Sequence, residues 1–283
     1  MREADFTDAA LVLLGHGSTV SAAAAAPVYQ HADELRRRGG FAQVLTGFWK
    51  LEPGLAGVLR GAFARRVFIV PLFISEGYFT REVLPRELGL RAPGAADFSP
   101  VQSRGEQTLH YCAPVGTHAR MTEVIRARAR AVVEQFPFPF CPRPGDTALI
   151  VAGHGTSLNE DSRAAIEAHA AALRWDGGYG EVHAAFLEEA PRIADFAGLT
   201  TRRNVVVVPF FISEGPHSQV DIPVALGEPE TLVRERLDQG RAGWRNPTER
   251  QGKRIWYAGP VGTDPVVAEV ILERVRESAA SGG

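Results

Sequence analysis

The chain is poor in cysteine, in long apolar runs and in excess positive charge. Cys112 and Cys141 are the only cysteines among 283 residues, too few for a disulfide framework or an iron–sulfur cluster. No apolar run approaches the roughly 18–20 residues of a membrane span. A net charge of −2 and a pI near 6.5 disfavour a general nucleic-acid-binding surface. We therefore expect a cytoplasmic protein that has neither a membrane nor a nucleic-acid partner.

Signatures of nucleotide binding and of export are also missing. Neither GxxxxGK nor GxGxxG occurs in the sequence, so we expect no nucleotide cofactor. The first residues, MREADFTDAALVLL, lack the positively charged segment and the cleavage site of a secretory signal. What the sequence does contain is an internal repeat.

Separate motifs recur along the chain in one register. VPLFISEG at 70–77 returns as VPFFISEG at 208–215, and the same offset of 138 carries the GHG at 15–17 onto the GHG at 153–155. PVGT at 114–117 returns at 260–263, an offset of 146, so the second copy is eight residues longer between these motifs. Several matches in one register indicate a tandem duplication rather than local convergence.

Each copy alternates β-rich and helical segments. We expect strands near 43–48, 66–74 and 108–113 in the first copy, and near 147–152, 181–187, 203–212 and 253–258 in the second. The apolar runs VFIVPLFI and VVVVPFFI are typical of strands buried on both faces of a parallel sheet. The pattern predicts an α/β fold with two similar Rossmann-like or flavodoxin-like lobes, residues 1–135 and 147–283, each with a roughly four-stranded parallel sheet. A proline-rich linker, 136–146, separates them.

Three side chains of the second copy follow three different strands. His154 lies in GHGT, Glu188 in AFLEEAP and His217 in SEGPHSQVDIP. Because ligands of such folds bind beyond the carboxyl ends of the strands, we expect these side chains to meet there. Two imidazoles and a carboxylate can bind a divalent metal and leave coordination positions open, and an imidazole can also accept a proton. The alternative is three unrelated polar residues at the strand ends.

The first copy differs at the equivalent positions. Phe79 stands in place of the second histidine and Lys50 in place of the carboxylate, and only His16 is retained. Phenylalanine cannot ligate a metal and an ammonium group repels one. We therefore expect a degenerate metal site, which serves as the opposite wall of a cleft where Phe79 and Phe48 offer apolar surface to a flat ligand. The equal alternative is that Phe79 belongs to the core.

Other polar residues have structural interpretations. Ser18 and Thr156, which follow the two GHG turns, can cap the next helix. His31 and His169 lie in expected helices, where we predict solvent-exposed faces.

These residues carry a family resemblance. LVLLGHGS with VPLFISEG, and LIVAGHGT with AFLEEAP, VPFFISEGPHSQVDIP and AGPVGTDP, resemble the CbiX/SirB sirohydrochlorin chelatases in their long tandem form. The resemblance covers nearly the whole chain, and the pairing of GHGT with GxHxxxDIP about 63 residues later is fairly specific. It departs from the familiar long members, whose catalytic pair usually lies in the first half, and the stretch 224–259 is unusual.

The resemblance implies a class II chelatase fold and a lyase activity. The expected reaction inserts cobalt or iron, with nickel as a further candidate, into a sirohydrochlorin-type tetrapyrrole for cobalamin or siroheme synthesis. The divalent metal is then a substrate. His154 and His217 would bind it with the help of Glu188, in a catalytic second lobe. His16, Phe79 and Lys50 would line the substrate cleft from the first lobe.

Two other functions stay open on the sequence. A non-catalytic carrier of a tetrapyrrole or a metal could descend from such an enzyme, given the ligands lost from the first copy. A phosphoryl-transfer enzyme with His154 as nucleophile would instead need an arginine cluster around that histidine. We expect a monomer with two lobes.

Overall fold

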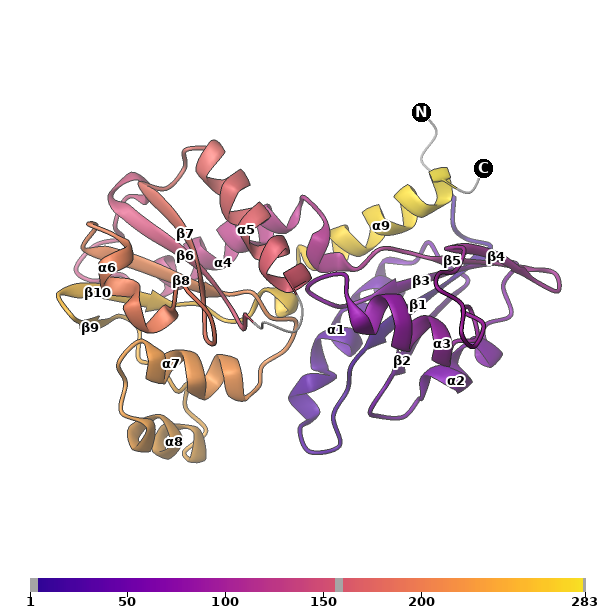
Figure 1. Ribbon diagram of the computed structural model, residues 1–283, viewed down its shortest axis with the longest axis horizontal. Coiled ribbons are helices and arrows are strands. Elements are labelled where there is room, and N and C mark those ends of the chain that lie inside the picture. Colours follow the sequence, from indigo (N-terminus) through magenta and orange to yellow (C-terminus); the bar gives the residue numbers. More distant parts are fainter. Residues whose placement is uncertain (1–4, 156–159, 282–283) are drawn as a thin grey trace. The chain divides into compact units, whose positions relative to one another are not determined.

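The computed structural model describes residues 5–155 and 160–281 and contains two five-stranded sheets flanked by helices (Figure 1). The first sheet has the order β2-β1-β3-β5-β4 and the second the order β7-β6-β8-β10-β9. The first comprises β1 (Ala9–Gly15), β2 (Gln43–Phe48), β3 (Arg66–Pro71), β4 (Val101–Arg104) and β5 (Gln107–Tyr111). The second comprises β6 (Thr147–Gly153), β7 (Glu181–Phe186), β8 (Asn204–Pro209), β9 (Thr248–Arg250) and β10 (Lys253–Tyr257). The predicted fold class, two similar α/β lobes, is confirmed.

Helices connect the strands in the same order in both copies. They are α1 (Ala26–Arg38), α2 (Leu55–Val58), α3 (Leu84–Glu87), α4 (Met121–Gln135), α5 (Glu160–Trp175), α6 (Phe196–Leu199), α7 (Ile222–Ala225), α8 (Glu230–Asp238) and α9 (Val267–Ser281). Single π-helical turns, Phe79–Val83 and His217–Asp221, lead into α3 and α7. Short 3₁₀ turns lie at 22–24, 59–61, 115–117, 144–146, 193–195 and 261–263. Across the described ranges, no helix is long and apolar enough to cross a membrane.

The four parallel strands expected in each copy are present, and each sheet has a fifth strand that the sequence did not indicate. β4 pairs antiparallel with β5, and β9 pairs antiparallel with β10. Both are short edge strands, with the sequences VQSR and TER. Apart from Val101, their side chains are polar, and most are half-buried or exposed, so they carry no hydrophobic run by which a strand could be detected.

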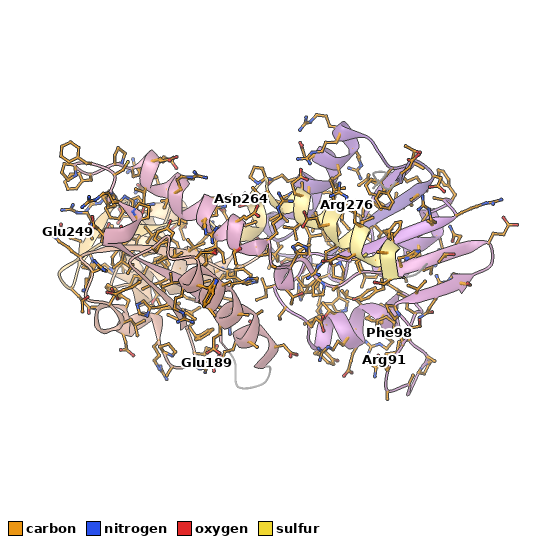
Figure 2. All side chains as sticks on the ribbon, turned by 90° about the horizontal axis from the view of Figure 1, so that it is seen from above. Arg91, Phe98, Glu189, Glu249, Asp264 and Arg276 are labelled. Atoms are coloured by element: carbon orange, nitrogen blue, oxygen red, sulfur yellow. The ribbon has the colours of Figure 1, made fainter. Side chains whose placement is uncertain are left out.

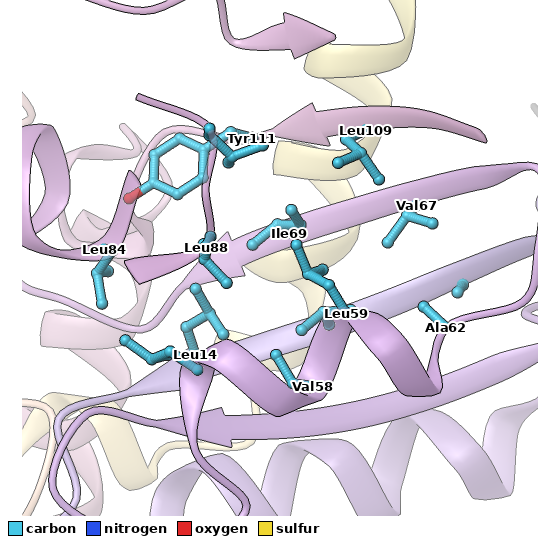
Figure 3. Close-up of a cluster of buried hydrophobic side chains, with 14 of the residues drawn as sticks. Leu14, Val58, Leu59, Ala62, Val67, Ile69, Leu84, Leu88, Leu109 and Tyr111 are labelled. Carbon is cyan, nitrogen blue, oxygen red and sulfur yellow. The ribbon is translucent and has the colours of Figure 1, made fainter. Parts of the chain in front are cut away.

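The parallel strands are buried on both faces. In β1, Ala10, Val12 and Leu14 join one apolar cluster with Val58 and Leu84 of the short helices (Figure 3). The residues between them along β1 are also fully buried and point to the opposite face because side chains alternate along a strand. That face is covered by α1. The continuous apolar runs of the sequence follow from this double burial.

The compact units of the structure are not bounded as the sequence repeats are. One unit comprises residues 1–118 and 265–283, and the other comprises residues 119–264. Helix α9 therefore packs in the first unit, on α1, β3 and β5, while α4 packs in the second, on α5, β8 and β10. The segment 136–146, expected as a linker between lobes, lies inside the second unit.

Each of these two helices is held by hydrogen bonds from an arginine at the same position of its sequence repeat. Arg274 of α9 donates to the Pro114 carbonyl at 3.0 Å and to Thr117 Oγ1 at 2.7 Å. Arg128 of α4 donates to Thr263 Oγ1 at 2.6 Å. Both partners lie in the repeated PVGT turns, so the two units use the same contact to fix a helix that comes from the other sequence repeat.

The second copy is longer between α7 and β9. In the first unit the corresponding loop is held by Arg91, which donates to the Ala95 carbonyl at 2.8 Å, and by Phe98, which packs edge-on against Tyr111 with ring centroids 5.3 Å apart (Figure 2). In the second unit the additional residues form α8, which packs beside α7 and the π-helical turn.

Candidate metal centre

His154 is presented by a turn that only glycine can complete. It follows β6 directly, and Gly155 after it has φ +66°; a Cβ at that position would lie 2.7 Å from side-chain atoms of Phe186 and Glu189. His154 Nδ1 donates to the Gly155 carbonyl at 2.9 Å. The Nε2 lone pair therefore stays available to a metal or a proton.

His217 is the first residue of the π-helical turn and lies against His154. The two ring centroids are 4.4 Å apart with the planes at 80°. Its Nδ1 lies 2.6 Å from Asp221 Oδ2, so the carboxylate orients the ring and leaves Nε2 free. A carboxylate behind an imidazole is the usual second-sphere support of a histidine metal ligand.

Glu188 is brought to the histidine pair by the backbone. Its N–H donates to the His154 carbonyl at 3.1 Å, and its Oε1 lies 3.5 Å from His154 Nε2. The side chains of Glu188, His154 and His217 are 59%, 29% and 48% exposed, so a metal can reach them from solvent. In the part of the chain that is described, no three such side chains already stand close enough together to hold a metal ion, and binding would require small rotations about χ angles.

The first unit keeps the backbone of this arrangement and replaces its chemistry. The Lys50 N–H donates to the His16 carbonyl at 2.8 Å, as Glu188 does to His154. His16 contacts Phe79 and Trp49, with ring centroids 5.3 and 5.0 Å away, and Lys50 Nζ lies 4.0 Å from the Trp49 ring centroid. Here an aromatic cluster and a cation occupy the positions of the ligands.

Several expectations from the sequence need correction. Phe48 is fully buried and offers no surface to a ligand, because its strand is covered on both faces. His31 and His169 are 1% and 4% exposed, since each lies on the helix face that packs on the sheet and not on the solvated face.

The helix cap expected from Ser18 is instead a local turn, in which Ser18 Oγ accepts hydrogen bonds from the backbone N–H groups of Val20 and Ser21 at 3.2 Å each. Thr156 lies outside the described residues.

Three residues that bear on the site were missed in the sequence. Asp221 could have been found from its i, i+4 spacing to His217. Trp49, beside Lys50, completes the aromatic cluster of the first unit. Tyr257 donates to the Ser218 carbonyl at 2.5 Å and so fixes the π-helical turn; its counterpart Tyr111 donates to the Thr80 carbonyl at 2.7 Å. Only tertiary structure shows these two tyrosine contacts.

The donor set selects a class of metal. Two imidazole nitrogens and one carboxylate oxygen suit borderline divalent ions such as cobalt(II), iron(II), nickel(II) or zinc(II), and they do not suit hard ions that prefer all-oxygen sites. With three protein donors at most, coordination positions remain for a second molecule that receives the ion.

Known proteins are similar to this chain along most of its length. The CbiX family model matches residues 10–132 and again residues 148–278. A protein of Halobacterium salinarum described as a probable sirohydrochlorin cobaltochelatase is 43% identical over 289 residues, which cover 97% of this chain and 93% of that protein. The sirohydrochlorin cobaltochelatase of Methanopyrus kandleri is 33% identical over 142 residues, 46% of this chain and 96% of its own.

Solved structures show the same fold. A multi-domain Deinococcus radiodurans protein with structural similarity to chelatases superposes with a TM-score of 0.75 at 32% identity, over 95% of this chain and 54% of that longer one. Bacillus subtilis SirB with Fe³⁺ superposes with a TM-score of 0.67 at 17% identity, over 97% of this chain and 96% of its own. The match of the family model to both halves, with a relative 43% identical along nearly the full length, establishes that this chain belongs to the CbiX family.

Proposed function

We propose that the protein inserts a divalent metal ion, cobalt or iron, into a sirohydrochlorin-type tetrapyrrole, as a lyase. The observation that carries the proposal is the His154–His217 pair, with rings 4.4 Å apart and each Nδ1 engaged by the protein. The relatives named above as cobaltochelatases support cobalt. Nickel fits the same donor set.

The reaction needs a metal carrier and a proton acceptor in one place. Insertion brings one divalent cation into the macrocycle and releases the two pyrrole N–H protons. The Nε2 atoms of His154 and His217 hold the incoming ion. As the ion leaves, Glu188 Oε1, 3.5 Å from His154 Nε2, accepts one of the two protons and an imidazole Nε2 that the ion vacates accepts the other. A positioned general base of this kind contributes about 10²–10⁴-fold in rate. The second unit is then the catalytic one.

In this proposal the first unit binds the tetrapyrrole and not the metal ion. Without a second imidazole or a carboxylate, His16, Phe79 and Lys50 cannot hold a divalent ion, and we assign them to the tetrapyrrole. The aromatic cluster of Trp49 and Phe79 suits a flat conjugated ring, and the exposed Lys50 ammonium suits a peripheral carboxylate.

The decisive experiment is an anaerobic insertion assay. Purified protein at catalytic concentration is mixed with sirohydrochlorin and cobalt(II) or iron(II), and the visible spectrum is followed beside a protein-free control. We expect many turnovers per protein, loss of at least 10²-fold in kcat/KM for His154→Ala and for His217→Ala, and no loss for His183→Ala, a half-buried histidine paired with Glu181. A single stoichiometric binding event without turnover would instead indicate a carrier, and full activity of His217→Ala would overturn the mechanism.

A further inference from the structure

The second unit contains a cavity that the first copy has no segment to build. It has a volume of about 800 Å³ and is bounded by α4, the π-helical turn, the end of α8 and the loop 239–247. The additional residues of the second copy fall in the segment that forms α8, which has no counterpart in the first copy. A volume of this size suits a small organic molecule rather than a single inorganic ion.

The cavity is strongly basic in a chain whose net charge is −2. Its lining includes four arginines, Arg128, Arg236, Arg241 and Arg245, and a single acidic residue, Glu214. That carboxylate already accepts from Gln219 Nε2 at 3.0 Å. The lining therefore carries an excess of positive charge that a bound anion would balance.

Three of these arginines differ from their neighbours in having no acidic partner. Arg234 pairs with Glu230 at 2.6 Å and Arg250 with Glu228 at 3.1 Å, both outside the cavity. Arg128 is held by Thr263 and by Asp264. For Arg236, Arg241 and Arg245, no ion pair or side-chain hydrogen bond is formed with any described residue. Unpaired guanidinium groups gathered on one cavity are typical of carboxylate or phosphate recognition.

Trp244 forms part of the wall of the cavity and is 3% exposed. Its counterpart in the first copy is Phe98, which packs on Tyr111 as Trp244 packs on Tyr257. The indole Nε1 atom is itself buried and meets no hydrogen-bond acceptor in the described ranges. The indole therefore shapes the wall, and the polar recognition in the cavity is left to the arginines.

The cavity is formed in advance of any ligand. A Cβ at Gly243 would lie 2.4 Å from the Gln219 carbonyl oxygen, so the loop approaches the π-helical turn as closely as a backbone can. Asn246 closes the other end, donating to the Tyr257 carbonyl at 2.9 Å and accepting from the Tyr257 N–H at 2.7 Å. The wall next to Gly243 is the turn that begins at His217.

From these observations we infer that the cavity binds an organic polycarboxylate, through the unpaired arginines of α8 and the loop 239–247. Three guanidinium groups spread over two elements match several separate carboxylates better than one phosphate. The carboxylates could belong to a free di- or tricarboxylate or to the periphery of a larger ring system. The site is distinct from the metal ligands and does not depend on metal insertion.

Calorimetric titration of the metal-free protein tests the site with two probes, citrate and sirohydrochlorin. Arg241→Ala and Arg245→Ala, both exposed positions that should fold normally, should each weaken binding about tenfold or more, and rising salt should weaken it in the native protein. Arg234→Ala, at an arginine outside the cavity that already pairs with Glu230, should bind as the native protein does.

The outcomes separate the two sources of the carboxylates. Losses with citrate alone identify a free polycarboxylate as ligand, and losses with sirohydrochlorin identify the ring's own substituents. The proposal is overturned if neither probe responds to Arg241→Ala and Arg245→Ala, or if Arg234→Ala causes the same loss. Because no metal is present, the result does not depend on whether insertion occurs.

Discussion

Asp221 orients the ring of His217, one of the two proposed metal ligands. It lies one helical turn away and contacts Nδ1 at 2.6 Å, so we treat it as a positioning residue that does not touch the metal. Asp221→Ala should lower cobalt(II) affinity about 10–100-fold, measured by titration in the visible range. The carboxylate is exposed, so stability should change by less than about 0.5 kcal/mol. Asp221→Asn should restore part of the affinity; unchanged affinity in both variants would remove the assignment.

His16 and His154 have the same backbone setting and different neighbours. His154 contacts a second imidazole and a carboxylate, whereas His16 contacts Trp49 and Phe79. His154→Ala should therefore abolish metal insertion, and His16→Ala should act mainly on KM for the tetrapyrrole. Steady-state kinetics of both variants make the comparison. Equal losses in kcat would show that both units hold catalytic groups.

The two cysteines should differ sharply in reactivity. Burial raises the pKa of the Cys112 thiol to about 12, so roughly one part in ten thousand is thiolate at pH 8. Cys141 is exposed. Native protein treated with iodoacetamide at pH 8 should take up one label by mass spectrometry, and Cys141→Ser should take up none. Labelling of Cys112 under native conditions would mean that its strand end opens to solvent.

At the scale of elements, the π-helical turns depend on a tyrosine from the neighbouring strand. Tyr257→Phe removes the hydrogen bond to Ser218 and should cost about 1 kcal/mol of unfolding free energy. It should also weaken cobalt binding, because the released turn carries His217. Tyr111→Phe is the matched control, since it removes the equivalent bond to Thr80 at a similar cost but leaves the metal ligands untouched. Equal cobalt affinity in the two variants would contradict this coupling.

At the scale of the whole molecule, each unit needs a helix from the other sequence repeat. Val267, Val270, Ile271 and Val275 of α9 are fully buried in the first unit, and four such side chains contribute about 6–12 kcal/mol. That is comparable to the whole stability of a domain.

Fragment 119–264 contains the complete second unit, including α4, the helix that comes from the other sequence repeat. We therefore expect this fragment to fold by itself, with a cooperative thermal transition followed by circular dichroism.

The repeat-based fragments should behave differently. Fragment 1–135 lacks α9, and fragment 147–283 lacks α4, so each exposes a sheet face and should unfold or aggregate. A chain in which 265–283 is joined to 1–118 by a flexible linker should recover the first unit. Cooperative folding of 147–283 alone would show that α9 can cover the sheet of its own repeat.

The sequence by itself determined the duplication and the α/β class, and it indicated the copy in which the proposed metal ligands lie. These properties reside in local information: repeated motifs in one register, apolar runs long enough for doubly buried strands, and the identities of Phe79 and Lys50 against His217 and Glu188. The tertiary structure decided the polar edge strands, the support of His217 by Asp221 and the basic cavity of the second unit. It also decided the exchange of α4 and α9, in which each helix packs on the sheet of the other sequence repeat. The exchange was not readable from sequence because both helices are amphipathic and each could cover either sheet. Which sheet they cover depends on long-range contacts, among them Arg128 with Thr263 and Arg274 with Thr117, and no local pattern encodes those contacts.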